Sequence, residues 1–521
     1  MNLAWAEDLT AMKKQTMTVA RTIAFGLITI TLIDTRGYTA PPVTEPDAKA
    51  ISLMRAAFKL VNPTNPKTAL IHAEGIQLLN NQGLNPQQST RIQRLSADWK
   101  VDFQNRRFLQ RSASRLGKDL MWCTGTGTTR EMRYQLFCHS NVFSNYGPPQ
   151  TDGSWTFRMD TTYPDPQWHL AHALERSQSL HWEGESVFDG QREDVISYSD
   201  EFNNHHRLSL NSTTHLLREV STAAQLTRFG EGFVPRIVFE NYRRNGRYWS
   251  PTKVTIVQNS WTIITSDLQS IRRNFDRSLS AADFAPPPGA IEVDQKSFDF
   301  HVSKVAPSIY FVENASPDYN SMFVVFTDYV LVVEAPSSDS DSKKVMAAIH
   351  EIAPGKPIRY IVPTHFHEDH IGGLRAYLRE GATVVTTPGN LRFMEMFMKR
   401  LKATQPQINL PAVEVIADKR RFSDGVVTVD LLNVANPHVD EMVVPFIPSD
   451  GIVYVADGFT RDWGPWRRPT SEERTLVRQF KQLGIDIRTV LPGHGPAASK
   501  KELERYLLSI GATIGSTGAN R

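Results

Sequence analysis

Three histidines and an aspartate stand within six positions of the segment PTHFHEDHIGG, residues 363–373. Imidazole side chains are costly to crowd together unless they bind something, and the usual partner is a metal ion. His365 and His367 lie two residues apart where the chain leaves a predicted buried strand, so in extended backbone both face one side. Asp369 and His370 follow where the chain turns into a predicted helix, and they can point together at a second ion.

The surroundings of this cluster separate it from the other histidines. Gly372 and Gly373 follow it directly, and without a Cβ atom they let the backbone pass close to the site. Six histidines elsewhere have no acidic or histidine partner at ligand spacing along the chain, so we expect ordinary hydrogen-bonded side chains there. They are His169, His172, His181, His205, His206 and His215.

The motif HFHEDH resembles the HxHxDH signature of the metallo-β-lactamase superfamily. The rest of that family's pattern follows in order: His438 comes after a predicted strand, Asp457 ends GIVYVADG, and His494 ends the stretch IRTVLPGH. The resemblance covers residues 291 to about 512. It implies an α+β fold of the αββα type, a sandwich of two sheets flanked by helices, and the near-continuous apolar strands alternating with predicted helices in this region agree with it.

Carried over residue by residue, the family implies two metal sites. The first would be held by His365, His367 and His438, the second by Asp369, His370 and His494, and Asp457 would bridge them. Each site would keep an open position, as catalytic zinc sites do. We expect two zinc ions per chain, while iron or manganese also suit nitrogen and oxygen ligands.

The resemblance implies a metal-dependent hydrolase, in which a hydroxide shared by the two metal ions cleaves an ester, thioester, lactone or amide bond. Asp369 is expected to be catalytic, by orienting the nucleophile or accepting its proton. The absence of a cysteine at the second site disfavours the zinc β-lactamases that use one. His367 stands where the di-iron oxidoreductases of the family usually have glutamate. The arrangement resembles that of glyoxalase II-like thioesterases and lactonases.

The loop GFTRDWGPWRRPTSEE after Asp457 is expected to overhang the site. It supplies a set of aromatic and cationic side chains that suit a small amphipathic or anionic substrate. The candidates for substrate binding are Arg461, Trp463, Trp466 and Arg467. The alternative is a solvated loop whose tryptophans pack on a neighbouring domain.

A chain of 521 residues is too long for one hydrophobic core, so more than one domain is expected. Residues 41–284 show short alternating segments typical of an antiparallel sheet, with helices near residues 46–60 and 164–180. The closing strands of this region weakly resemble the half-barrels of lipoprotein carriers, in which a curved sheet wraps an apolar ligand or a helix. Residues 285–297 form a Pro-rich linker, and residues 298–521 form the hydrolase domain.

The N-terminal 40 residues have the layout of a secretory signal peptide or an N-terminal anchor, with Met12 as a candidate start. A basic stretch precedes an apolar run that is short for a membrane span. Pro41 is unfavourable for cleavage after Ala40, so an uncleaved anchor or a buried helix stays open. We predict an exported, periplasmic or otherwise extracytoplasmic protein.

Cys123 and Cys138 lie in one predicted hairpin, away from the histidine motif, and neither is expected to bind a metal. In an oxidising compartment they could pair, and two free buried thiols fit the spacing equally well.

The net charge of the chain bears on which classes of partner it binds. With 58 basic and 55 acidic side chains the net charge is close to neutral, which gives no drive toward nucleic acid. A small-molecule substrate is expected, and the N-terminal sheet domain is expected to contact an apolar ligand or an envelope surface. The alternative function is an envelope protein that binds an apolar ligand and carries a sensory or non-catalytic metal domain.

Overall fold

The computed structural model describes most of the chain from residue 47 onward. The described ranges are 47–61, 66–80, 82–116, 119–129, 132–137, 141–146, 159–201, 204–228, 231–257, 262–274, 279–294, 299–316, 319–460 and 471–502. Residues 45–521 form one compact unit. The leader lies outside the described ranges, so its export role stays a prediction. Within them, no helix is both long and apolar enough to cross a membrane.

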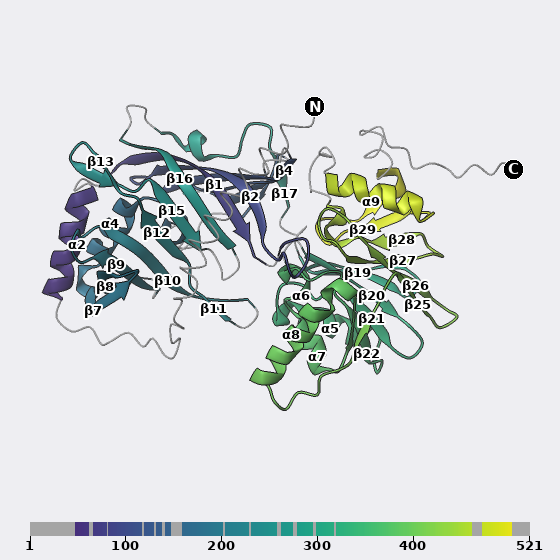
Figure 1. The fold of residues 1–521 in the computed structure, drawn as a ribbon. Coiled ribbons are helices and arrows are strands. Elements are labelled where there is room, and N and C mark those ends of the chain that lie inside the picture. The colour runs from purple at the N-terminus through teal and green to yellow at the C-terminus, as the bar shows by residue number, and fades with distance from the viewer. Residues whose placement is uncertain are drawn as a thin grey trace, which may run out of the picture. The chain divides into compact units, whose positions relative to one another are not determined.

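The N-terminal half folds into one large sheet of fifteen strands, shown in purple to teal in Figure 1. Its order is β17-β6-β5-β4-β3-β2-β1-β16-β15-β12-β10-β9-β8-β7, with β11 paired to β10, and the pairs are antiparallel except β17 with β6. The strands are β1 Thr68–Leu79, β2 Arg91–Asp102, β3 Arg107–Leu116, β4 Asp119–Thr128, β5 Arg133–Phe137, β6 Val142–Asn145, β7 His181–Phe188, β8 Gln191–Ser199, β9 His205–Asn211, β10 Leu217–Arg228, β11 Glu231–Phe233, β12 Arg236–Glu240, β15 Lys253–Val257, β16 Thr262–Arg273 and β17 Ile291–Val293. A separate hairpin joins β13 Arg243–Asn245 and β14 Tyr248–Ser250. The predicted antiparallel sheet is confirmed.

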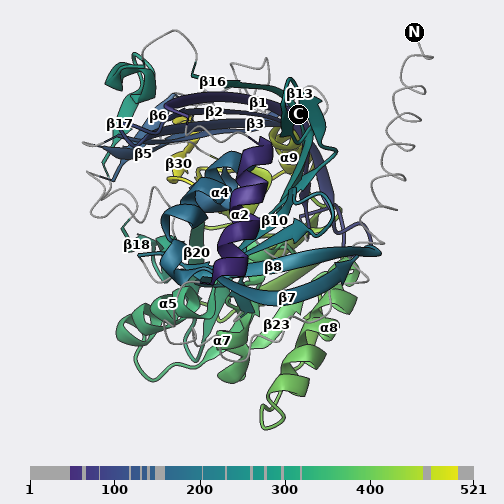
Figure 2. The same ribbon diagram turned by 90° about the vertical axis from the view of Figure 1, so that its left-hand side faces the viewer.

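Two helices pack together against part of this sheet, as Figure 2 shows. They are α2 Ala48–Val61 and α4 Pro166–Glu175, and the short η1 Ser177–Ser179 follows α4. Asp165 caps α4 by accepting a hydrogen bond from the Gln167 backbone N–H, and Pro166 occupies the first turn, where its missing N–H costs nothing. Their apolar faces share one core with β8, β9, β10 and β12. Both helices were predicted from the sequence.

The predicted linker, residues 285–297, is partly built into the sheet. η2 Ala281–Phe284 precedes it, and the carbonyl of the buried Phe284 accepts a hydrogen bond from Tyr134 Oη at 2.7 Å. β17 then pairs with β6 in parallel. The sheet therefore extends to residue 293, because this segment supplies backbone donors and acceptors to an otherwise open edge.

Cys123 lies in β4 and is disulfide-bonded, so the alternative of two free thiols is wrong. Cys138 lies outside the described residues. A disulfide is the state favoured in an oxidising compartment, which agrees with the export prediction without testing it.

The C-terminal half contains two further sheets. The seven-stranded sheet has the order β18-β19-β20-β21-β22-β23-β24, and the six-stranded sheet has the order β25-β26-β27-β28-β29-β30. The strands are β18 His301–Ala306, β19 Ile309–Ser316, β20 Tyr319–Val325, β21 Val330–Val333, β22 Ile358–Val362, β23 Thr383–Thr386, β24 Val413–Val415, β25 Lys419–Ser423, β26 Thr428–Val434, β27 Met442–Ile447, β28 Ile452–Tyr454, β29 Thr489–Leu491 and β30 Ala498–Ser499. One apolar core joins side chains of both sheets, so they pack face to face.

Helices cover the outer faces of this sandwich (Figures 1 and 2). They are α5 Asp339–Ile352, α7 Leu374–Arg379, α8 Pro388–Thr404 and α9 Ser471–Gln482. The short α6 Glu368–Ile371 and the 3-10 turn η4 Ala456–Gly458 lie in the segments that follow β22 and β28. A second core joins α5, α7 and α8 to the seven-stranded sheet, and α9 packs on the other sheet. The expected αββα sandwich is confirmed. The last predicted helix, residues 499–511, lies largely outside the described residues.

Gly373 makes a close contact that differs from the one predicted. A Cβ atom there would lie 2.0 Å from Ser342 Oγ and 2.4 Å from the Ser338 carbonyl oxygen. Both atoms belong to the first turn of α5 or its cap, so the glycine lets α5 approach the loop that carries the metal-binding motif. Its N–H also donates to the Ala335 carbonyl.

We therefore expect Gly373→Ala to destabilise the protein by about 2–4 kcal/mol, because the methyl group must displace backbone of α5. Gly355→Ala is the matched control: it has open space around it but a φ of +78°, and conformational strain alone costs about 1–2 kcal/mol. Denaturant unfolding would measure both. Equal losses in the free energy of unfolding for the two variants would show that the close contact with α5 adds no cost at Gly373.

Candidate metal centre

The motif segment is fixed at the carboxyl end of a buried strand. β22 ends at Val362, and His365 and His367 follow in the loop, fully buried. The short helix α6 then carries Asp369 and His370. The four side chains predicted from spacing are thus presented by one strand–loop–helix unit.

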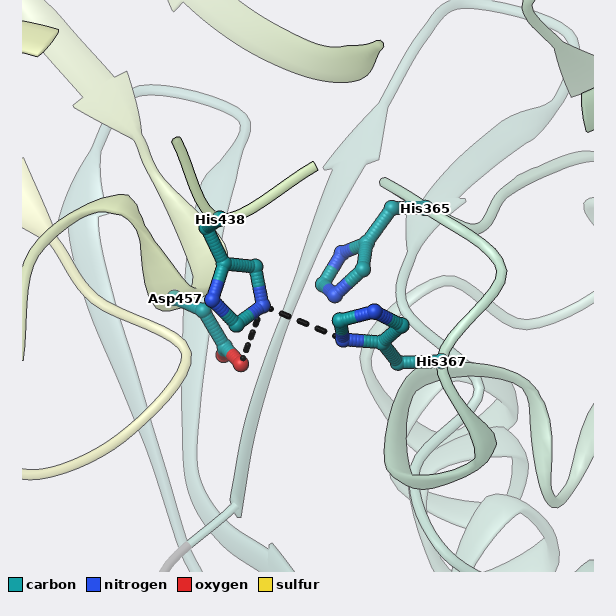
Figure 3. A group of neighbouring side chains, drawn as sticks. All are labelled: His365, His367, His438 and Asp457. Carbon is teal, nitrogen blue, oxygen red and sulfur yellow. Dashed lines mark hydrogen bonds and ion pairs between the residues drawn. The ribbon is translucent and has the colours of Figure 1, made fainter. Parts of the chain in front are cut away.

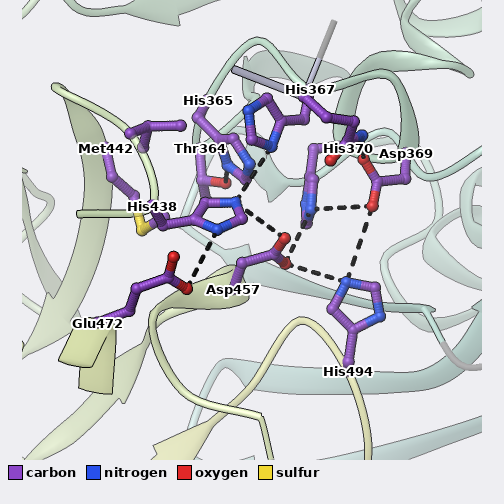
Figure 4. A network of polar contacts seen from close by, with 12 residues as sticks. Thr364, His365, His367, Asp369, His370, His438, Met442, Asp457, Glu472 and His494 are labelled. Atoms are coloured by element: carbon purple, nitrogen blue, oxygen red, sulfur yellow. Dashed lines mark hydrogen bonds and ion pairs between the residues drawn. The ribbon is translucent and has the colours of Figure 1, made fainter. Parts of the chain in front are cut away.

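The remaining candidates come from the other sheet. His438 lies between β26 and β27, Asp457 lies in η4 just after β28, and His494 follows β29. β28 and β29 are parallel, so their carboxyl ends lie at the same edge. Figure 4 shows all of these side chains converging between the two sheets. The structure brings together all seven predicted ligands, in two groups that share Asp457.

The first group comprises His365, His367, His438 and Asp457 (Figure 3). His438 Nε2 lies 3.1 Å from His367 Nδ1 and 3.1 Å from Asp457 Oδ2. The His365 and His367 rings are 4.3 Å apart between centroids, with their planes at 72°. Three imidazole nitrogens and one carboxylate oxygen therefore face a common point.

The second group comprises Asp369, His370, His494 and the same aspartate, Asp457. Asp457 Oδ1 lies 3.0 Å from His370 Nε2 and 2.9 Å from His494 Nε2. Asp369 Oδ2 lies 3.5 Å from His370 Nε2 and 3.9 Å from His494 Nε2. The two carboxylate oxygens of Asp457 thus face different groups, as a bridging ligand requires.

Hydrogen bonds made away from the centre fix the imidazole rings. His367 Nε2 donates to the carbonyl of Gly83 at 2.8 Å, and His370 Nδ1 donates to Glu334 Oε2 at 2.7 Å. Carbonyl and carboxylate oxygens can only accept, so these outer nitrogens carry protons. When the rings are neutral, the inner nitrogens therefore present lone pairs to the centre.

The other two rings of the motif region follow the same pattern. His438 Nδ1 lies 3.5 Å from Glu472 Oε2, and His365 Nδ1 lies 3.0 Å from Thr364 Oγ1. An outward-facing Nδ1 leaves Nε2 directed inward in each ring.

Several inward atoms are buried and have no hydrogen-bond partner outside the centre itself among the described residues. They are His365 Nε2, His370 Nε2 and Asp457 Oδ1. Each such atom costs about 1–3 kcal/mol, and lone pairs that face one another at about 3 Å also repel. A divalent cation would satisfy all of them, and the nitrogen and oxygen donors suit zinc, iron or manganese. The residues present therefore fit a metal pair.

The pKa values of the imidazoles at this centre are shifted in opposite directions. Burial lowers the pKa of His370, but the carboxylates of Asp457 and Glu334 outweigh it and raise that pKa well above its usual range. Burial also opposes protonation of His438, yet Asp457 and Glu472 raise its pKa. Burial, together with neighbouring imidazoles, lowers the pKa of His365 well below its usual range.

Several contacts to the centre were missed by the sequence reasoning. The Glu334 carboxylate accepts hydrogen bonds from the His370 ring and from the Thr364 N–H. The backbone of Glu334 itself has a φ of +76°. A charged residue directly after the buried strand β21 was the available signal for it. Glu472 in α9 is paired with Arg91 of β2 at 2.8 Å, with both side chains largely buried.

The loop between β1 and β2 also reaches the centre. Gln82 Nε2 donates to Asp369 Oδ1 at 2.7 Å, next to the Gly83 contact with His367. The Leu84 carbonyl accepts from the Asp440 N–H at 2.8 Å. Nothing in the sequence spacing pointed to these residues, which lie more than 280 positions before the motif.

The proposed substrate residues Arg461, Trp463, Trp466 and Arg467 lie outside the described residues. Their role stays a prediction.

A third group of possible ligands lies in the N-terminal sheet domain. His206 Nε2 is 3.4 Å from Asp200 Oδ2 and 3.7 Å from Asp160 Oδ2, and all three side chains are buried. Burial raises the pKa of Asp160 to about 6. His206 therefore has acidic partners that spacing along the chain did not reveal, whereas His169 simply bonds the Tyr163 carbonyl. We assign this group no function.

Comparison with known proteins places the centre in a family. The segment from residue 318 to residue 494 matches the family model described as the metallo-beta-lactamase superfamily. Residues 318–494 form a metallo-β-lactamase superfamily domain. All seven candidate ligands of this superfamily domain lie inside the matched segment.

Individual proteins are similar to parts of this chain only. The linear primary-alkylsulfatase of Pseudomonas sp. (strain ATCC 19151) is 43% identical over 51 residues, which is 10% of this chain and 10% of that protein. Among solved structures, a metallo-beta-lactamase from Pontibacter korlensis has a TM-score of 0.32 at 18% identity and covers 41% of this chain and 98% of that chain. The sec-alkylsulfatase Pisa1 from Pseudomonas sp. has a TM-score of 0.31 at 16% identity, with 40% of each chain covered. The two structural likenesses, at TM-scores of 0.32 and 0.31, carry no argument about function.

Glu334→Gln should lower the affinity for zinc by about 10–100-fold, because the amide holds the His370 ring less firmly and makes it less basic. Competition with a chromophoric chelator would measure it. Glu351→Gln, an exposed change at the end of α5, is the control and should leave affinity unchanged. An unchanged affinity in Glu334→Gln would show that the carboxylate does not support the metal.

Zinc binding at pH 7 should release about one to two protons per chain. The raised pKa values favour the protonated forms of His370 and His438 in the metal-free protein, and a ligand nitrogen must lose its proton. Affinity should therefore rise as pH increases toward those pKa values. Titration calorimetry in two buffers of different ionisation enthalpy would measure the release. Identical heats in the two buffers would contradict the prediction.

Proposed function

We propose that this protein is a metal-dependent hydrolase with two adjacent metal sites that share Asp457. The proposed ligands of the first site are His365, His367 and His438, and those of the second are Asp369, His370 and His494. The observation that carries the proposal is the convergence of buried imidazole nitrogens on one carboxylate, with several inward atoms that have no partner outside the centre among the described residues. Such a centre is unfavourable unless cations complete it.

A pair of divalent ions there would lower the pKa of water toward about 7 and act as a Lewis acid on the bond to be cleaved. The protein's own contribution is orientation. Outward hydrogen bonds from His367 and His370 prevent ring rotation, so the donor atoms are arranged before any ligand arrives.

Asp369 is the residue we propose to position the nucleophile and to take its proton. Gln82 holds one carboxylate oxygen, Oδ1, and leaves Oδ2 facing His370 and His494. This carboxylate is therefore fixed in rotation while one oxygen stays available at the centre.

The bond we propose for cleavage is an ester in the broad sense, with thioesters, lactones and amides as related candidates. The name of the alkylsulfatase relative supports an ester. The donor set of histidine and aspartate, without thiolate, supports a hydrolytic zinc pair over a closed structural site. The other candidate function is a ligand-binding protein with a non-catalytic metal domain, and the complete ligand set argues against it.

Elemental analysis of protein purified without chelator should give about two divalent ions per chain, predominantly zinc. The same preparation should hydrolyse an ester from a panel of p-nitrophenyl acetate, p-nitrophenyl octanoate, octyl sulfate and a lactone. Chelation should abolish the activity and added zinc should restore it. A protein that binds no metal even when zinc is offered would overturn the proposal.

His367→Ala should lower kcat/KM on the ester by about a thousandfold, the effect of losing several kcal/mol of metal-supplied stabilisation. Circular dichroism should show that the fold is retained. His350→Ala, an exposed histidine of α5, is the control and should keep full activity. Similar activity in both variants would exclude a catalytic role for this site.

A further inference from the structure

Building on the proposed function, we propose that one face of the N-terminal sheet is the wall of a substrate chamber. The chamber would hold the non-reacting part of the substrate, which we infer to be an uncharged amphipathic chain such as an acyl or alkyl group with neutral hydrogen-bonding functions. The bond to be cleaved would then lie at the metal centre.

A cavity of about 410 Å³ supports this assignment. Its volume lies within the range of small-molecule sites. Most of its lining comes from six neighbouring strands, and a few residues come from the metal-centre region. The lining residues are Gln77, Leu79, Gln82, Leu95, Ala97, Trp99, Gln110, Ser112, Ser114, Thr124, Thr126, Thr162, Ile256, Ile264, Tyr319, Glu368 and Asp369.

The strand register shows that this wall is one continuous face. Trp99 lies opposite Gln110, and Gln110 lies opposite Thr126. One step along, Ala97 lies opposite Ser112, which in turn lies opposite Thr124. Directly opposed residues point to the same side of a sheet, so β2, β3 and β4 present one grid of side chains to the cavity.

The neighbouring strands continue the same face. Gln77 of β1 lies opposite Ile264 of β16, and Ile264 lies opposite Ile256 of β15. All three line the cavity. The chamber wall is thus a property of the sheet's pleat and not of a single loop.

The chemistry of this wall sets the class of ligand. β2 contributes an apolar row of Leu95, Ala97 and Trp99, while β3 and β4 contribute hydroxyl and amide groups. Among the described residues that line the cavity, none is a lysine or an arginine, and the charged ones are Glu368 and Asp369 at the metal-centre end. An anionic group would meet no counter-charge from the described part of this wall. A neutral chain with both apolar and hydrogen-bonding parts matches it.

The same face also carries buried polar groups without a hydrogen-bond partner among the described residues. Trp99 Nε1 and Ser114 Oγ are buried and lack a hydrogen-bond partner among the described residues. Gln93, which shares the face of β2 with Leu95, is 1% exposed, and neither its amide oxygen nor its nitrogen has a partner among the described residues. Native proteins rarely leave such groups unsatisfied, so this face is less completely paired than an ordinary core.

The cavity is continuous with the proposed catalytic residues. Asp369, a candidate metal ligand, lines it together with Gln82, which holds that aspartate. Tyr319 also lines the cavity. Its ring packs edge-on against the His494 ring, with 4.5 Å between the ring centroids. A molecule in the chamber would therefore reach the centre from the side of the second metal site.

Dye binding tests the chamber independently of catalysis. The neutral dye N-phenyl-1-naphthylamine would be titrated into the full-length protein as purified, and the related anionic dye 8-anilinonaphthalene-1-sulfonate would be compared with it. We expect saturable binding of the neutral dye and affinity for the sulfonate that is about tenfold weaker. Equal affinity for the two dyes would overturn the assignment of an uncharged ligand.

Two substitutions that fill the chamber, Ala97→Phe and the milder Ser112→Leu, should each weaken binding of the neutral dye by about tenfold. Ser96→Phe is the matched control, because Ser96 lies on the opposite face of β2, and it should bind as the unaltered protein does. Thermal unfolding would check the folding of each variant. Unchanged binding in a folded Ala97→Phe or Ser112→Leu protein would overturn the chamber.

Hydrolysis of p-nitrophenyl octanoate and p-nitrophenyl acetate separates this inference from the proposed function. The unaltered protein should prefer octanoate by about tenfold in kcat/KM, and Ala97→Phe should remove that preference. Dye binding that responds to the variants without hydrolysis of either ester would support the chamber and overturn the hydrolase. Hydrolysis without chain-length preference, and without dye binding, would support the hydrolase and overturn the chamber.

Discussion

The structure depends on one buried carboxylate. Asp457 lies between imidazoles that come from loops of both sheets, and its two oxygens face separate groups of nitrogen donors. The imidazoles lower the pKa of this aspartate well below its usual range although burial raises it, so the carboxylate is charged. A buried charge that faces lone pairs is tolerated only where cations or protons compensate it. The close packing of the two sheets brings these loop ends together.

Around that carboxylate lies a set of residues that hold the rings in place. Glu334 and Glu472 come from the superfamily domain, whereas Gly83, Gln82 and Arg91 come from the N-terminal sheet domain. The N-terminal sheet domain therefore contributes to the geometry of the proposed metal centre as well as to the cavity beside it. Outer contacts of this kind commonly affect metal affinity nearly as much as the ligands themselves.

The N-terminal sheet has two kinds of core. At one end α2 and α4 cover it with an apolar core, as in an ordinary layered domain. Near β1 to β3 a second apolar core lies on the sheet, and beside it β1 to β4 present hydroxyl, amide and apolar side chains to a cavity. Some buried polar groups there have no partner among the described residues, which is rare in a packed core. This contrast is the physical basis for assigning a binding role to the sheet, which composition and strand pattern alone could not provide.

The sequence by itself determined the local elements and the candidate ligands. The spacing from His365 to His370 works because a strand, a loop and a helix turn have fixed geometry over a few residues, and β22 and α6 follow that expectation. Only the tertiary structure decided which atoms meet across long separations. The contact of Gly83 with His367, the pairing of acidic groups with His206, and the continuous wall from β15 to β4 depend on strand register and sheet packing. Those features arise from long-range pairing, which no short window of sequence specifies.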